Sequence, residues 1–204
     1  MRRTSFIVFA GVIAAAVVLS TRPAFAGPPL VCFPFDIGQA RSLPILQTGY
    51  GAVDPKYDVA HLVADTLELL TPKAPVIVHM ETIRRAALYA KANPNAGAAL
   101  LSALKTRAEA RSGDAPLAVF DFGYLVETYR QAGAQVLGDV DGYVWVEKAI
   151  ALSGDPQMEF AAAIMSRWSQ RPDYTVHVRM VAAAARNDEL LNRNLAAHIP
   201  ESQP

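Results

Sequence analysis

The stretch that decides the fold is residues 155–168, which read DPQMEFAAAIMSRW. A short polar residue followed by proline suits the first turn of a helix, because Asp155 can accept hydrogen bonds from free backbone amides and Pro156 needs no amide partner there. The apolar residues after it recur at the i, i+3, i+4, i+7 spacing of one helix face: Met158, Ala161, Ala162, Met165 and Trp168. The segment is therefore predicted to be an amphipathic helix.

Asp, Asn, Pro and Gly also stand at the expected starts and ends of helices through most of the remaining chain. Further helices are expected over residues 54–70, 76–91, 93–110, 114–133, 142–152, 173–186 and 188–198. Links of roughly two to six residues leave antiparallel hairpins as the way for the chain to return. No strand pattern competes with this interpretation. The predicted fold class is all-α, with a helical-repeat domain over 54–199 that stacks antiparallel hairpins as a short right-handed α-solenoid, and with a frayed tail over 200–204.

The first 26 residues have the pattern of a signal peptide. A basic start at Arg2 and Arg3 precedes an apolar run over residues 6–19, and Ala24-Phe25-Ala26 supplies a small-x-small cleavage site. The run is shorter than the ~20 residues that span a bilayer. We therefore expect a signal peptide over 1–26, export to the periplasm or the medium, and no membrane span after its removal.

Residues 27–53 are rich in proline and glycine and follow neither a helical nor a strand period. They are too apolar to stay in water, so we expect an irregular N-terminal arm that packs on the helices. The arm carries the one cysteine of the chain, Cys32, which excludes an intramolecular disulfide. Its thiol could be free and packed among apolar neighbours, form an intermolecular bridge or act as a redox group.

A sequence pattern that occurs twice in the chain indicates a repeat protein. Residues 88–94 (LYAKANP) return about 62 residues later as 150–156 (IALSGDP), close to twice a unit of roughly 31 residues. Leu125, Tyr129 and Gly133 match first-helix positions of the tetratricopeptide repeat, and 151–156 resembles the end of its second helix. On these residues the chain resembles a tetratricopeptide-like helical repeat protein, which implies stacked helical hairpins, although residues 134–142 place about six extra residues between the two helices. The start of the arm resembles that of a group of exported bacterial proteins of unassigned function.

Charge and motifs argue against several function classes. The chain has 19 basic and 19 acidic side chains, and removing 1–26 would leave a net charge of about −3, which argues against a nucleic-acid partner. No Gly-x-Ser-x-Gly, phosphate-binding glycine loop or Cys-x-x-Cys is present, and the four histidines lack ligand spacing, so neither a metal nor a cofactor is expected. Residues 138–142 alternate glycine and aspartate like part of a calcium loop. Leu137 and Lys148 would then occupy ligand positions, so the segment is interpreted as a turn and helix cap.

Aromatic residues cluster in the fourth and fifth expected helices, and core packing accounts for most of them. Phe120, Tyr124, Tyr143 and Trp145 are the candidates for a binding groove. We therefore expect a protein- or peptide-binding module of the bacterial cell envelope.

The alternative is an envelope enzyme, or an accessory subunit of one, whose site forms where the arm crosses the helices. Cys32 would need a basic neighbour to act as a thiolate, and His61 or His79 could supply it. His61 also shares a predicted helix face with Asp65, most simply as a surface pair. His177 is interpreted as a semi-buried core residue.

Overall fold

A computed structural model describes residues 27–46, 52–110, 115–134 and 138–199. The predicted signal peptide (1–26) and frayed tail (200–204) lie outside these residues. The described part is all-α, as predicted, and its elements are α1 (Pro29–Cys32), a 3₁₀ turn (Val59–His61), α2 (Leu62–Leu69), α3 (Val76–Ala92), α4 (Pro94–Glu109), α5 (Ala115–Ala132), α6 (Gly142–Ser153), α7 (Pro156–Trp168), α8 (Tyr174–Ala184), a 3₁₀ turn (Ala185–Asn187) and α9 (Glu189–His198). None of the helices in these ranges is long and apolar enough to cross a membrane.

Short polar side chains set the helix starts. Asn93, Asp141, Asp155 and Asp188 each accept a hydrogen bond from a backbone amide two or three residues further on, at 2.8–3.1 Å. Each bond satisfies an amide that the first turn of a helix leaves without a partner. The turn-and-cap interpretation of residues 138–142 is thereby confirmed.

Two boundaries differ from the sequence prediction. The helix expected from residue 54 begins as α2 at Leu62, after turns in which Asp54 and Asp58 accept bonds from the amides of Lys56 and Ala60 at 2.9 and 3.0 Å. Such local side-chain bonds offer the backbone an alternative to the helix, which explains the later start. The arm, expected to be irregular, contains the single helical turn α1.

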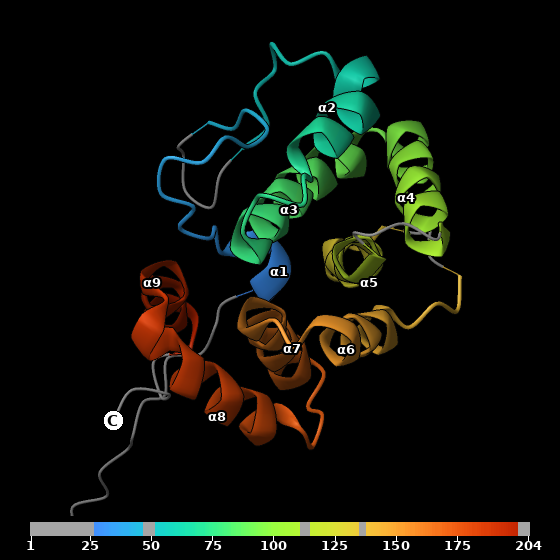
Figure 1. The fold of residues 1–204 in the computed structure, drawn as a ribbon. Coiled ribbons are helices and arrows are strands. Elements are labelled where there is room, and N and C mark those ends of the chain that lie inside the picture. The colour runs from blue at the N-terminus through green and yellow to red at the C-terminus, as the bar shows by residue number, and fades with distance from the viewer. Residues whose placement is uncertain (1–26, 47–51, 111–114, 135–137, 200–204) are drawn as a thin grey trace, which may run out of the picture.

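Helix α5 lies at the centre of the molecule, with α3, α4, α6 and α7 around it (Figure 1). Every residue from Ala118 to Tyr129 is buried, including the charged residues Asp121 and Glu127. A helix buried on all sides is typical of the core of a domain. Successive helices from α3 to α8 also contact one another.

The crossing of α5 and α6 depends on two glycines that bring the backbones together. A Cβ added at Gly123 would lie 2.6 Å from the carbonyl oxygen of Gly142 and 2.7 Å from Cβ of Trp145. A Cβ at Gly142 would lie 2.3 Å from the carbonyl oxygen of Gly123. Neither neighbour is a flexible side-chain end, so any larger residue must push the helices apart.

We predict that Gly123→Ala destabilises the protein, although alanine is the better helix former by about 1 kcal/mol. Overpacking at the crossing should lower the free energy of unfolding by about 1–3 kcal/mol, measured by urea denaturation. Ala151→Ser on the exposed face of α6 is the control and should change it by less than about 0.5 kcal/mol. A Gly123→Ala protein as stable as the wild type would contradict the close crossing.

Candidate functional site

The structure separates the four predicted groove residues by burial. Phe120, Tyr124 and Tyr143 are 0 %, 0 % and 4 % exposed, so their side chains are part of the core and offer no surface to a partner. Burial raises the pKa of Tyr124 well above its usual value, which keeps its hydroxyl neutral. Trp145 is only half-buried and reaches the surface. It is the predicted residue that remains available for binding.

Trp145 lies in a hollow between the end of α4, the start of α5 and the outer face of α6, which we call the α4–α6 groove. The groove has a volume of about 670 Å³ and is lined by Ala108, Glu109, Ala110, Ala115, Val119, Trp145, Lys148 and Leu152. Apart from Glu109 and Lys148, these side chains are apolar. A mostly apolar hollow with a few charged groups at its edge is the usual form of a binding site.

The indole of Trp145 is fixed from one side. Its ring packs edge-on against Phe122 in α5, with centroids 4.7 Å apart at 84°. The Nζ atom of Lys148 lies 5.4 Å from the ring centroid, a cation–π distance. Leu152, 55 % exposed, continues the apolar surface by two further turns of α6. The groove therefore presents a positioned aromatic ring, an aliphatic side chain and a basic group.

A second hollow, of about 790 Å³, also borders the start of α5, at Pro116 and Leu117. Its polar side chains already have partners within the fold. Asp155 accepts from the amide of Gln157 at 2.8 Å, and Gln157 bonds the amide of Ile77 and the carboxylate of Asp188. We therefore place the candidate binding site in the α4–α6 groove.

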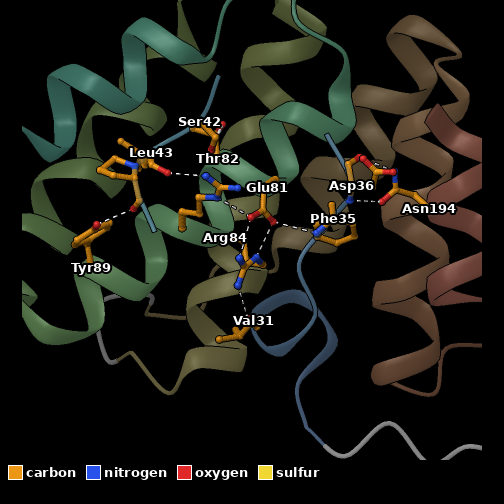
Figure 2. A network of polar contacts seen from close by, with 12 residues as sticks. Val31, Phe35, Asp36, Ser42, Leu43, Glu81, Thr82, Arg84, Tyr89 and Asn194 are labelled. Atoms are coloured by element: carbon orange, nitrogen blue, oxygen red, sulfur yellow. Dashed lines mark hydrogen bonds and ion pairs between the residues drawn. The ribbon is translucent and has the colours of Figure 1, made fainter. Parts of the chain in front are cut away.

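The N-terminal arm packs on the helices, and α3 holds its backbone at several points (Figure 2). The contacts run along α3 in order: Glu81 accepts from the amide of Phe35 at 3.1 Å, Arg84 donates to the carbonyl of Val31 at 3.0 Å, Arg85 donates to that of Leu43 at 2.7 Å, and Tyr89 donates to that of Pro44 at 2.7 Å. Polar side chains of one helix thus supply hydrogen-bond partners for backbone groups of the arm.

The centre of this network is a buried ion pair. Glu81 and Arg84 are 0 % and 1 % exposed, and Arg84 donates from Nε and Nη2 to the two carboxylate oxygens at 2.7 and 2.8 Å. Arg85 adds a bond to the same carboxylate at 2.7 Å. A two-point bond between a guanidinium and a carboxylate is among the strongest polar contacts in proteins.

The arm also reaches the C-terminal end of the fold. Asp36 and Asn194 of α9 exchange two hydrogen bonds at 2.8 and 2.9 Å, and Arg193 donates to the Asp36 carboxylate at 2.8 Å. Phe35 stacks on the His198 ring, with centroids 4.6 Å apart. Burial lowers the pKa of His198 to about 4, so its imidazole is neutral near pH 7.

Cys32 is a free, half-buried thiol at the end of α1. His79 is buried and uses both ring nitrogens, at 2.7 Å from Asp121 Oδ1 and 3.0 Å from the carbonyl of Thr71. His61 lies at the surface, with Nε2 3.8 Å from Asp58, and Asp65 accepts from Tyr57 at 2.8 Å instead of pairing with His61. His79 therefore has no free nitrogen with which to activate Cys32. Among the described residues, no group of three His, Cys, Asp or Glu side chains is placed to hold a metal ion.

The Glu81–Arg84 pair was not predicted from the sequence. The signal was present, because Glu81 and Arg84 stand at helical spacing between the buried residues Ile77, Met80 and Ala87. Charged residues on the apolar stripe of a helix indicate a buried pair. The carbonyl of Val31 and the amide of Phe35 also bond to this pair. The sequence does not reveal these two partners, since almost every residue has the same backbone groups.

We predict that Glu81→Gln lowers the free energy of unfolding by about 3–5 kcal/mol, because it leaves the Arg84 guanidinium buried without its counter-charge. The measurement is denaturation by guanidinium chloride. Glu68→Gln is the matched control, since it breaks the ion pair with Arg41 at 3.1 Å in which both side chains are at least 70 % exposed. Equal effects of the two substitutions would contradict the central role of Glu81.

A second prediction concerns acid stability. His198 in the folded chain takes up a proton only near pH 4, whereas in the unfolded chain it does so near its ordinary pKa of 6.5. Falling pH therefore favours unfolding from about pH 6.5 downward, and the wild type should lose about 3 kcal/mol through this group by pH 4. His198→Phe should be less sensitive by that amount when urea denaturation at pH 7 and pH 4 is compared. Identical pH profiles would show that His198 is not protected from protonation.

Comparisons with known proteins do not bear on this geometry. No protein-family model, no curated protein and no solved structure matches the chain. The features that bear on function are therefore the α4–α6 groove and the N-terminal arm that packs on the helices.

Proposed function

We propose that the protein is an exported helical scaffold that binds a peptide segment of a partner protein in the bacterial cell envelope, and that the α4–α6 groove is the binding site. The observation that carries the proposal is the half-buried Trp145 in a hollow of about 670 Å³ beside the 55 % exposed Leu152. Exposed apolar side chains gathered in a hollow are typical of interaction sites.

The groove indicates the chemistry of the peptide. Its apolar wall suits one or two aliphatic or aromatic side chains, which Trp145 and Leu152 would contact. At its edge Glu109 is paired with Lys105 at 2.9 Å, which leaves Lys148 to supply the net charge. An acidic residue next to the apolar side chains would complement Lys148.

The rest of the proposal concerns location and scaffold. The basic, apolar and small-x-small pattern of residues 1–26 supports export to the periplasm or the medium. Contacts between successive helices from α3 to α8 support hairpins stacked as a short right-handed solenoid of the tetratricopeptide type. The all-round burial of α5 is less regular than such a stack requires. The enzyme alternative has less support, because both ring nitrogens of His79 are bonded elsewhere, which leaves the surface residue His61 as the other histidine for Cys32.

We predict that peptides selected from a random displayed library bind the wild type through the groove. Binding is measured by fluorescence of Trp145 in a Trp168→Phe background, since the chain has two tryptophans. Leu152→Glu should weaken binding by at least about tenfold, because it places a charge against the apolar side chains of the peptide. Met180→Glu is the matched control, since Met180 on α8 is also 55 % exposed.

Positions 152 and 180 can also be used to test whether the native partner binds at the groove. A photo-crosslinking residue at 152, in cells of the organism of origin, should capture a partner whose yield falls when a selected peptide is added. The same residue at 180 should not capture it. Selected peptides that bind Leu152→Glu as well as the wild type, or capture from position 180 alone, would contradict the α4–α6 groove as the site.

A further inference from the structure

The walls of the α4–α6 groove suit a further helix. Helices α4 and α6 both pack on α5 and lie on two sides of it (Figure 1). The groove is lined by residues of all three helices, and the buried Val119 of α5 forms part of its floor. Ala108 at the end of α4 and Ala115 at the start of α5 also line it. Small side chains at a contact allow a short distance between helix axes, so a helix could lie close to this floor.

The outer face of α6 carries its side chains at the spacing that a second helix matches. Trp145 and Leu152 are seven residues apart, which is about 10.5 Å along the helix axis. Val144, 59 % exposed, stands with Lys148 and Leu152 at the i, i+4, i+8 spacing of one helix face. A helix that lies along this face would meet it with residues at i, i+4 and i+7 of its own sequence.

The N-terminal arm shows what this fold uses to hold an extended segment. Side chains of α3, α5 and α9 bond backbone groups of residues 30–44 at several points. The polar side chains that line the α4–α6 groove are fewer: Lys148, Trp145 and Glu109. Glu109 is already paired with Lys105 at 2.9 Å. An extended peptide would therefore find few side-chain partners for its backbone in the groove, whereas a helix bonds its own backbone.

The charge of the groove specifies the helix further. Lys148 stands three residues after Trp145 and four before Leu152, so a carboxylate between the apolar side chains of the partner would meet it. We propose that the groove holds its peptide as an amphipathic α-helix along α6. Its apolar residues at i, i+4 and i+7 pack on Trp145, Leu152 and the adjoining Val144, and a carboxylate at i+3 faces Lys148. This binding mode rests on the proposed function of the groove and adds the conformation and residue pattern of the peptide.

The test selects two displayed peptide libraries on the wild-type protein. One fixes leucine at i, i+4 and i+7; the other fixes leucine at i, i+2 and i+4 with proline at i+3, a pattern that a helix does not accommodate. The first library alone should yield peptides that bind Leu152→Glu at least about tenfold more weakly than the wild type, with acidic residues enriched at i+3. Leu152-dependent peptides of equal affinity from the second library would overturn the helical partner and leave the groove as a peptide site. No Leu152-dependent peptide from either library would contradict the proposed function itself.

Lys148→Glu tests the carboxylate at i+3. Peptides with glutamate there should bind this variant about fivefold more weakly than the wild type, and lysine at the same peptide position should restore the affinity. Lys91→Glu is the matched control, since Lys91 at the end of α3 is also exposed and does not line the groove. An unchanged preference for glutamate in Lys148→Glu would refute the pairing.

A further measurement uses the wild-type protein alone and does not depend on how a variant folds. The ¹³Cα shifts of a labelled peptide from the first library should move to helical values when the protein is added. Proline at i+2, which faces away from the groove, should weaken binding at least about tenfold relative to alanine at that position, because proline disrupts a helix interior. Extended shifts in the bound peptide, or equal binding of the proline and alanine peptides, would equally overturn the proposal.

Discussion

One buried carboxylate, that of Glu81, holds the N-terminal half of the structure together. A carboxylate and a guanidinium removed from water cost several kcal/mol unless nearly every donor and acceptor finds a partner. Glu81 and Arg84 satisfy most of this need themselves, and Arg85, the amide of Phe35 and the carbonyl of Val31 contribute further bonds. The ion pair is therefore complete only when the arm is in place. In the same way, the described part of the arm has few internal backbone bonds, and side chains of α3 supply partners for several of its backbone groups.

The arm in turn connects elements that are distant in the sequence. Beyond α3 it bonds Gln131 near the end of α5 through the amide of Leu30 at 2.9 Å, and it bonds Asn194 of α9 through Asp36. Its apolar residues Leu30, Phe35 and Leu43 are buried in the same core as the helices. The arm therefore braces both ends of the helical domain against the central α5. The arm makes these contacts away from the outer face of α6, so Trp145 and Leu152 on that face remain at the surface.

The sequence predicted the elements better than it predicted the sites. Helix starts followed from single residues, because an aspartate or asparagine before a helix caps it by a local bond that sequence reveals. The one late start, at Leu62, arose where Asp54 and Asp58 made turns with the same local chemistry. Of the aromatic candidates, Phe120 and Tyr124 offer no surface for a different reason, since they lie on a helix that is buried on every side. The central position of α5 depends on where the other helices pack, and the sequence pattern of α5 alone does not give that information.

Two histidines show how the same side chain takes opposite roles according to what surrounds it. His198 is enclosed by Phe35 and Phe160, whose rings sit 4.6 and 5.9 Å away and offer no counter-charge in the ring plane, so burial excludes the proton. His177 is equally buried, yet its two nitrogens meet a carboxylate and a hydroxyl that already donates elsewhere. These bonds tie α8 to α6 and α7. Acid therefore acts on the contact between the arm and α9, where His198 stays neutral, whereas His177 links helices through both of its ring nitrogens.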